Sequence, residues 1–252
     1  MTLLNPSSPL DPYFDFQLEA NTPNYERENP LADKRDSDRY SPTLREFHRL
    51  LWSKDLPDGR SVELTAASQN RLEMTVGSSS ILLSSDRAVT SYIARPKLMV
   101  KHSEEGKERV IAFHRLSDTM GGIIIWPSQK IGSLITINGH RGFHSRIADR
   151  LDLTLECVRR HYSRESSPLS ATLGRYSHFF DLFVDFRGYV DFFLFQDWVA
   201  SDYLSVKATL SIDDFQRPGI PQDASEHLQY MDATEVMIRA RNSRIAHYLT
   251  SL

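Results

Sequence analysis

The spacing of apolar residues changes along the chain, and each change predicts a different kind of secondary structure. After Ser41 and Pro42, which suit the N-cap and first position of a helix, apolar residues recur every three or four positions up to Leu51. Residues 61–137 contain short β-branched runs separated by glycine, serine, asparagine or charged residues, which predicts strands joined mainly by hairpins. From about residue 139 the helical spacing returns.

This order of segments predicts an α+β fold, in which a twisted, mostly antiparallel sheet from about residues 61–137 is packed by C-terminal helices. One more strand is expected near residues 204–211, where apolar and polar residues alternate, and a long helix over residues 223–252. The predicted strands of the sheet are VELTAAS, RLEMTV, SILLSS, TSYIA, KLMVK, RVIAFHRL, GIIIW and SLITIN.

Residues 1–40 are expected to form an irregular N-terminal arm, and residues 41–252 a single α+β domain. Five of the 12 prolines lie in the arm, and no pattern in it favours a regular element. Two alternatives are open for this segment. The arm is either disordered, or anchored to the domain through Tyr13, Phe14 and Phe16.

Composition and charge narrow the class of protein. The formal net charge of −3 gives no strong global field, so capture of nucleic acid by charge alone is not expected. The single cysteine, Cys157, excludes an intrachain disulfide and, together with an N-terminus that lacks a signal-peptide pattern, favours a cytoplasmic location. The apolar runs are too short to cross a bilayer, so no membrane partner is expected.

The most distinctive local segment is TINGHRGF, residues 136–143, which joins a predicted strand to a predicted helix. Its two glycines allow close backbone approach, and the free N–H groups of the helix start would point into the same space. This is a candidate phosphate- or carboxylate-binding turn. An ordinary Asn-Gly turn with solvated neighbours is the alternative. The candidate phosphate-binding residues are Asn138, Gly139, His140, Arg141, Gly142 and Arg146.

The predicted helix after the turn is rich in arginine, the residue that binds phosphate bidentately. Contact with a nucleotide or nucleic acid is one interpretation, with Glu156 as a candidate catalytic general base. A solvated helix face with ion pairs such as Glu156 with Arg160 is the alternative. His140 and His144 have the spacing of a metal-binding pair, but no third ligand is evident, so no metal site is predicted.

Residues 176–203 combine many aromatic side chains with interleaved charges, and most of the rings are expected in the core. Asp185 belongs either to a structural network or, with Asp191, to a pair of catalytic acid–base groups that face a pocket. Cys157 is expected to be a small core residue rather than a nucleophile. No cofactor is identified, because the common phosphate, dinucleotide, zinc and nucleophile motifs are absent.

Two long segments are specific enough to carry a family resemblance. They are TINGHRGFHSRIADRLDLTLECVRRHY (136–162) and SPLSATLGRYSHFFDLFVDFRGYVDFFLFQDWV (167–199). With shorter segments beyond residue 40, they resemble an uncharacterised bacterial and phage family, a domain of unknown function. The resemblance implies no catalytic residue. It implies a small cytoplasmic accessory protein of the mobile kind, a class enriched in toxins, antitoxins and phage-defence factors.

The residues support two functional hypotheses. In the first, the chain is a toxin- or defence-like enzyme that acts on a nucleotide or nucleic acid, ADP-ribosyl transfer being one compatible reaction. In the second, it is a non-catalytic protein-interaction module of a mobile-element or defence system, which binds a partner through residues 176–203 or the arm. A concave pocket where arginines meet a carboxylate would favour the enzyme, and an exposed apolar patch the module.

Overall fold

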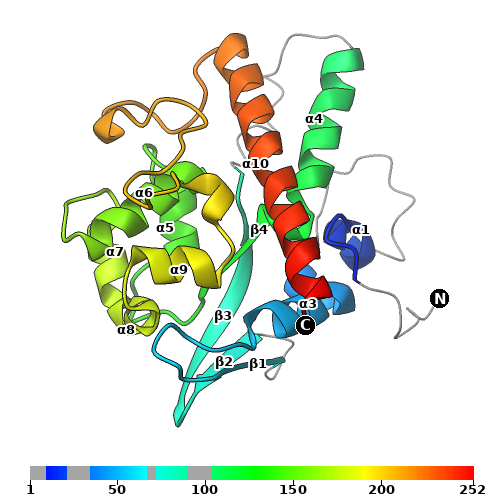
Figure 1. Ribbon diagram of the computed structural model, residues 1–252. Coiled ribbons are helices and arrows are strands. Elements are labelled where there is room, and N and C mark those ends of the chain that lie inside the picture. The colour runs from blue at the N-terminus through cyan, green and yellow to red at the C-terminus, as the bar shows by residue number, and fades with distance from the viewer. Residues whose placement is uncertain (1–9, 22–34, 67–71, 90–103) are drawn as a thin grey trace.

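A four-stranded antiparallel sheet with strand order β1-β2-β3-β4 organises the chain. The computed structural model describes residues 10–21, 35–66, 72–89 and 104–252. In Figure 1 the helices α5 to α9 lie on one side of the long strand β3, while α10, α4 and α1 lie on the other. The strands are β1 (Val62–Ala66), β2 (Leu72–Val76), β3 (Ser79–Arg87) and β4 (Ile123–Pro127).

Helices account for most of the remaining described chain, so the molecule has the α+β class that the sequence predicts. Four short 3-10 helices are η3 (Met120–Gly122), η4 (Asp181–Phe183), η5 (Gln196–Trp198) and η6 (Asp213–Phe215). The α-helices are α1 (Phe16–Asn21), α2 (Ser37–Tyr40), α3 (Pro42–Trp52), α4 (Glu104–Ser117), α5 (Ile137–Phe143), α6 (Leu151–Tyr162), α7 (Ser170–Arg175), α8 (Ser177–Phe180), α9 (Phe186–Phe192) and α10 (Ala224–Thr250).

Three of the predicted strands are wrong. RVIAFHRL forms α4, because its buried residues Val110, Phe113 and Leu116 recur every three positions and share one helix face. SLITIN becomes a loop and the start of α5, where the Thr136 hydroxyl caps the helix by accepting a hydrogen bond from the Gly139 N–H. The segment near 204–211 forms only an isolated bridge through Val206. The predicted strands TSYIA and KLMVK lie outside the described residues.

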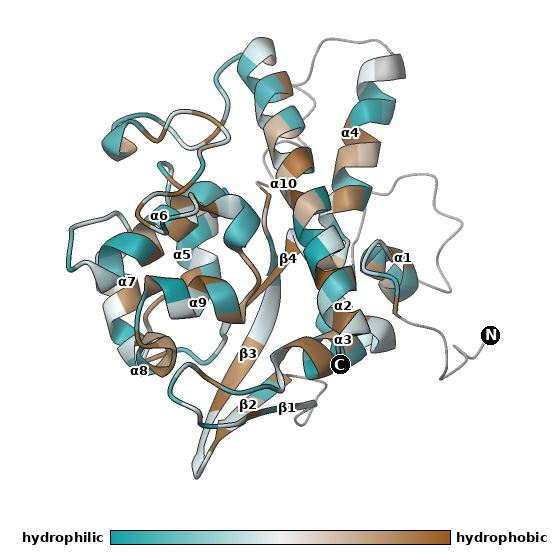
Figure 2. Ribbon diagram, viewed as in Figure 1, coloured by the Kyte–Doolittle hydropathy of each residue, from teal (hydrophilic) through white to brown (hydrophobic). Residues whose placement is uncertain are grey.

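Strand β4 and helix α10 form the centre of the core. All five residues of β4 are buried, and Figure 2 shows the strand as hydrophobic along its length. Helix α10 alternates between hydrophobic and hydrophilic residues in the same view, because it buries a single stripe that includes Met231, Ile238 and Ile245.

A fully buried arginine joins α10 to the rest of the core. The Arg241 guanidinium donates hydrogen bonds to the carbonyl oxygens of Gly121 (3.1 Å), Ile123 (2.7 Å) and Phe193 (2.9 Å). It also lies 4.1 Å from the centroid of the Phe195 ring. Burial lowers the pKa of Arg241 to about 9. The side chain therefore links the helix, the η3 turn and the aromatic segment after α9.

The described part of the N-terminal arm contains regular structure that the sequence did not predict. Phe16 of α1 is fully buried, and its ring centroid lies 5.6 Å from that of Phe47 in α3. Glu19 accepts hydrogen bonds from the Ser41 hydroxyl and, at 3.2 Å, from the Thr43 backbone N–H at the start of α3. Helix α1 thus supplies both an apolar contact and a second cap for α3.

Candidate active site

The predicted anion-binding turn is helix α5, and its arginine points into the protein. The Arg141 side chain is fully buried. Its guanidinium donates hydrogen bonds to the Thr154 hydroxyl (2.9 Å) and the Asp149 carbonyl oxygen (2.8 Å), and forms an ion pair with Asp86 of β3. The Arg87 carbonyl oxygen accepts a further bond at 3.3 Å. Arg141 is therefore engaged on every side by the protein itself.

Asp86 and Asp149 flank the Arg141 guanidinium. Arg141 Nη1 contacts Asp86 Oδ2 and lies 4.0 Å from Asp149 Oδ1, and these two carboxyl side chains remain 27% and 17% exposed. Burial raises the pKa of Asp149 to about 6 and also raises the pKa of Asp86, while Arg141 opposes both shifts. Two carboxyl groups that share one cation titrate as a pair, so the protonation of each depends on that of the other.

The backbone around Asp149 is unusual in a way that fits a functional site. Ala148 and Asp149 have φ values of 49° and 62°, in the left-handed region that non-glycine residues seldom occupy. Gly142 makes room for the carboxylate, because a Cβ atom there would lie 3.2 Å from both Asp149 carboxylate oxygens. The Asn138 amide donates a hydrogen bond to the Ser84 hydroxyl of β3 at 3.2 Å. The TINGHRGF segment thus positions Arg141 and Asp149 against Asp86.

A cavity of about 340 Å³ opens beside the carboxylate pair. The Arg87 Nε atom pairs with Asp118 Oδ1 at 2.5 Å, and its Nη2 donates a hydrogen bond to Gln17 Oε1 at 3.0 Å. Arg35 stacks over the Tyr40 ring, with 5.0 Å between its Cζ atom and the ring centroid. The residues that line the cavity include Gln17, Arg35, Ser85, Asp86, Arg87 and Asp149.

A hydrogen-bond network beneath the cavity fixes the position of β3. The Trp52 indole N–H donates to His48 Nδ1 (2.9 Å), so His48 Nε2 carries the proton that it donates to the Ser85 hydroxyl (2.8 Å). Asp38 Oδ2 accepts the Ser85 backbone N–H at 2.7 Å. Burial lowers the pKa of His48 to about 3 and raises that of Asp38 to about 6, so His48 is neutral.

The other predicted phosphate-binding residues do not converge on this cavity. His140 Nδ1 is 2.6 Å from the Thr172 hydroxyl, and burial lowers the pKa of His140. Arg146 is exposed in the segment between α5 and α6. The His140 and His144 rings are 5.4 Å apart, and the described part of the chain contains no group of residues that could hold a metal ion.

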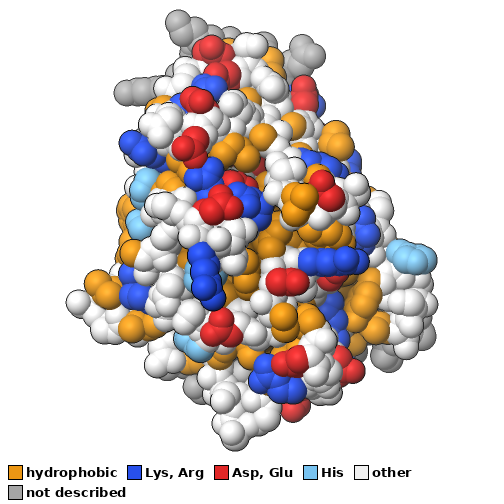
Figure 3. Space-filling view, turned by 60° about the vertical axis from the view of Figure 1, so that its left-hand side comes forward, with side chains coloured by type: hydrophobic (Ala, Val, Ile, Leu, Met, Phe, Trp, Pro, Cys, Tyr) orange, Lys and Arg blue, Asp and Glu red, His pale blue; other side chains and the backbone are white. Residues whose placement is uncertain are grey.

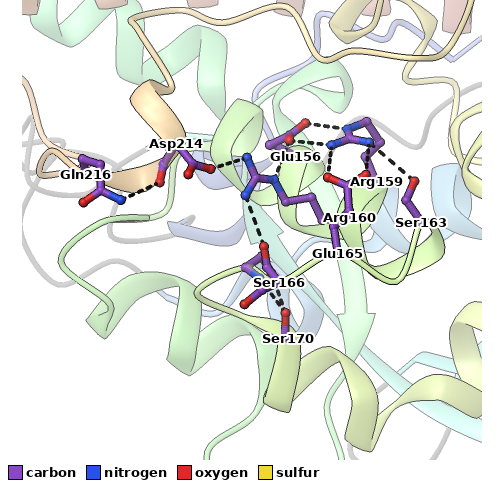
Figure 4. A network of polar contacts seen from close by, with 10 residues as sticks. Glu156, Arg159, Arg160, Ser163, Glu165, Ser166, Ser170, Asp214 and Gln216 are labelled. Atoms are coloured by element: carbon purple, nitrogen blue, oxygen red, sulfur yellow. Dashed lines mark hydrogen bonds and ion pairs between the residues drawn. The ribbon is translucent and has the colours of Figure 1, made fainter.

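Glu156 belongs to an ion-pair network on α6. Its carboxylate accepts hydrogen bonds from the Arg159 Nε–H (2.9 Å) and the Arg160 Nε–H (2.8 Å). Figure 4 shows Arg159 reaching Glu165, and Arg160 reaching Asp214 of η6. These contacts match the helical ion pairs that the sequence offers as the alternative to a general base. They attach η6 to α6. Among the described residues, the side-chain donors to the Glu156 carboxylate are Arg159 and Arg160, which form ion pairs with it.

Asp185 lies at a second pocket, away from the carboxylate pair. It is the N-cap of α9, where Oδ1 accepts the Gly188 N–H at 2.7 Å. The pocket has a volume of about 450 Å³, and its wall also includes Lys54 and Asp191. The structure therefore brings Asp185 near Asp191, as the acid–base interpretation supposes, but not near Arg141 or Glu156.

The aromatic segment 176–203 forms core rather than a binding surface. Ten of its eleven aromatic side chains are buried, and the eleventh, Tyr203, is half-buried against them. Cys157 is also buried, and burial raises the pKa of its thiol to about 12, which makes it an inert core residue. No helix among the described residues has the length and apolar character needed to cross a membrane.

Charges on the surface do not form a field of one sign on the side seen in Figure 3. Basic and acidic side chains lie next to one another across this face, with hydrophobic side chains between them. A long nucleic acid held only through its phosphates needs a continuous basic area. This face therefore offers no such area.

Sequence reasoning missed the importance of Asp86 and Asp149. Asp86 ends a strand-like run, ILLSSD, and Asp149 lies in an arginine-rich segment where it reads as an ordinary ion-pair partner. The one available signal was the position of a lone acidic residue at the end of an apolar strand. Its pairing with Arg141 depends on a contact across 55 residues, which no local pattern reveals.

Comparisons with known proteins place the chain in a family without indicating an activity. No curated protein and no solved structure matches it. A family model described as "Family of unknown function (DUF6994)" matches residues 10–245, which includes α1, the sheet and all but the end of α10. The chain therefore belongs to the family of unknown function DUF6994.

Proposed function

We propose that the chain is a cytoplasmic enzyme with a catalytic acid–base carboxyl group at Asp149, and that its substrate is a nucleotide or nucleic acid strand end. The observation that carries this proposal is the pair Asp86 and Asp149 around one buried guanidinium, at the wall of a cavity. Carboxyl groups with raised pKa values that share a site and remain accessible to solvent are typical of acid–base catalysts.

Each group has a role that follows from its contacts. Asp149 is the more weakly paired carboxylate, so it accepts or donates the proton. Asp86 balances the buried charge of Arg141, and Arg141 fixes the distance between the two carboxylates. Arg35 and Arg87 line the same cavity as the carboxylates Asp36, Asp86 and Asp149. Arg87 is held by Asp118 and Gln17, so Arg35 is the arginine that would pair with a phosphate group of the substrate.

The substitution Asp149→Asn tests the catalytic role, because it keeps the shape of the side chain and removes the titratable group. The wild-type protein is incubated with ATP, GTP, CTP, UTP, NAD⁺ and a short RNA, and products are identified by mass spectrometry. We expect conversion of at least one compound, and a loss of about 100-fold or more in Asp149→Asn. Arg146→Ala, which alters an exposed residue outside the cavity, should keep the wild-type rate.

The pH dependence of that rate gives a second readout. If Asp149 acts as a general base, the rate should rise as the pH increases through about 6 and then level off. Conversion of none of the compounds, or an unchanged rate in Asp149→Asn, would rule the proposal out.

A toxin or phage-defence role is part of the same proposal. Its support is the resemblance of residues 136–162 and 167–199 to a bacterial and phage family. Overexpression of the wild-type protein should arrest bacterial growth, whereas Asp149→Asn at equal abundance should not. Growth arrest by both proteins would show that toxicity does not depend on the Asp149 carboxyl group.

A protein-interaction module is the second candidate function, and one observation favours it. Residues 131–143 expose four large apolar side chains, of which Phe143 is 79% and Leu134 is 50% exposed. Exposed apolar side chains grouped in one segment suit a protein partner. The double substitution Leu134→Ser and Phe143→Ser should then abolish capture of a specific partner while leaving the melting temperature unchanged. The other two exposed residues are Ile131 and Ile135.

A further inference from the structure

A second pocket, of about 450 Å³, lies where the chain leaves α3 and meets the start of α9. It shares no lining residue with the cavity at Asp149. One wall is apolar and the other carries charged side chains from both elements. The residues that define it are Lys54, Leu56, Pro57, Asp185, Asp191 and Phe192.

The Lys54 amino group sits at the apolar wall in an aromatic box. Its Nζ atom lies 5.4 Å from the ring centroid of Trp52, 4.8 Å from that of Phe192 and 4.9 Å from that of Tyr248. No side chain or carbonyl among the described residues forms a hydrogen bond or ion pair with this Nζ atom. An amine held against rings on one side and open to a pocket on the other is free to react with a ligand.

The surroundings of Lys54 make its neutral form more accessible than in an exposed lysine. Burial lowers the pKa of Lys54 from 10.5 to about 8, the nearby Arg241 guanidinium lowers it further, and Asp191 opposes the shift. Arg187 faces the same pocket but is 70% exposed and lies 3.6 Å from Asp191. The neutral amine is the nucleophilic form of lysine, and desolvation by an apolar wall is a known way of populating it.

The charges of the pocket indicate what kind of ligand it accepts. Three carboxylates, Asp55, Asp185 and Asp191, line it together with two basic groups, Lys54 and Arg187. Arg187 lies 3.6 Å from Asp191, and Lys54 is held against aromatic rings, so neither basic group is placed to pair with an anionic ligand. Carboxylate oxygens accept hydrogen bonds from hydroxyl groups, while Leu56 and Pro57 suit a short carbon chain.

We propose that this pocket binds a small, neutral, hydroxylated aldehyde or ketone, and that Lys54 holds it as an imine. The nitrogen lone pair attacks the carbonyl carbon, and the electrons of the C=O π bond move to the oxygen. The oxygen takes up one proton to become a hydroxyl group, then a second, and leaves as water. The nitrogen gives up its two protons to solvent, and its lone pair forms the second bond of C=N. The C=N bond that forms replaces the C=O bond, with one water released and no oxidation or reduction.

Reductive trapping tests this proposal on the full chain. The protein is treated at neutral pH with D-glyceraldehyde and cyanoborohydride, which reduces an imine to a stable amine. Peptide mass spectrometry then measures the rate of labelling at each lysine. We expect Lys54 to be labelled roughly tenfold or more faster than the exposed Lys130. Lys54→Met confirms the assignment of the labelled peptide.

Two comparisons separate a ligand pocket from a merely reactive lysine. Asp185→Asn keeps an N-cap residue at the start of α9 and removes one carboxylate, so labelling of Lys54 should fall severalfold while that of Lys130 stays constant. With the anion glyoxylate as the aldehyde, the preference for Lys54 over Lys130 should be smaller. The proposal fails if Lys54 reacts no faster than Lys130. It fails equally if Asp185→Asn and glyoxylate both leave the preference unchanged.

Discussion

Asp38 gives the protein a stability that depends on pH. Burial raises the pKa of its carboxyl group from 3.8 to about 6, so the folded state binds this proton more tightly than the unfolded state. The resulting contribution is fully present below about pH 4 and is lost as the pH rises through about 6. Asp38→Asn removes it. Relative to wild type, the variant should therefore gain up to about 3 kcal/mol between pH 4 and pH 7.

Chemical denaturation of both proteins at the two pH values measures this difference. The pKa values of Asp86 and Asp149 are also raised, but both groups are present in both proteins, so their contributions largely cancel in the comparison. A difference between wild type and Asp38→Asn that is the same at both pH values would show that folding does not raise the pKa of Asp38.

Arg141 illustrates how burial decides between two roles for one side chain. The sequence offers it as an anion-binding residue, but its guanidinium is fully buried and engaged by Asp86, Thr154 and Asp149. Arg141→Ala would leave the Asp86 carboxylate without its partner, which costs about 3–5 kcal/mol. We expect a large fall in melting temperature. The exposed Arg146→Ala should change stability by less than about 0.5 kcal/mol, and similar melting temperatures for both variants would contradict the buried ion pair.

At the scale of elements, α10 and η3 approach each other closely. A Cβ atom at Gly121 would lie 2.3 Å from the Ile238 carbonyl oxygen and 2.8 Å from Asn242 Oδ1, which itself accepts the Gly121 N–H at 2.6 Å. Gly121→Ala should therefore push α10 away from β4 and destabilise the protein by several kcal/mol, on the order of 3.

Gly174 in α7 provides the matched substitution. A Cβ atom there would meet nothing within 4 Å, and its φ value is not positive. Gly174→Ala should raise stability by up to about 1 kcal/mol, because alanine favours the helix. Thermal unfolding of both variants measures the contrast, and equal shifts would mean that α10 and η3 do not pack this closely.

Local signals predicted α3 and α10, and failed where a pattern was ambiguous. Ser41 and Asp223 cap α3 and α10, and both helices begin at the residue that follows. The run RVIAFHRL fits either alternation or a helical spacing, and only its packing against α10 selects the helix. Thr136 converts the end of an apolar run into a helix start, which β propensity alone does not reveal.

The candidate site depends on contacts that are distant in sequence. The segment TINGHRGF, which is distinctive in the sequence, supplies Arg141 and the space for Asp149. The spacing of residues did not predict that Arg141 is buried, because its ion-pair partner Asp86 lies on β3, which precedes α4 in the sequence. Whether Arg141 faces solvent or the core is set by this long-range pairing rather than by the helix itself.

At the scale of the whole molecule, the N-terminal segment raises the question of how many cooperative units the chain contains. Phe16 is fully buried against Phe47, and the Phe16 N–H donates a hydrogen bond to the Asp118 carbonyl oxygen at 3.1 Å. If α1 is integral to the core, Phe16→Ala should destabilise the whole protein by about 3–5 kcal/mol. If α1 is only an attached arm, the core should keep its stability and the arm alone should open.

Native-state hydrogen exchange separates these outcomes, because it reports the opening free energy of each segment. We expect Phe16→Ala to lower the protection of β4 and α10 together with that of α1, in a single unfolding transition. Tyr13→Phe is the control. Tyr13 is 42% exposed, and its hydroxyl contacts the Arg239 carbonyl oxygen (3.2 Å) and the Ser243 hydroxyl (3.3 Å), so loss of this hydroxyl should leave β4 unaffected. Lowered protection confined to α1 would instead support a domain that begins near residue 41, as the sequence predicts, because the burial of Phe16 would then contribute to docking and not to the core.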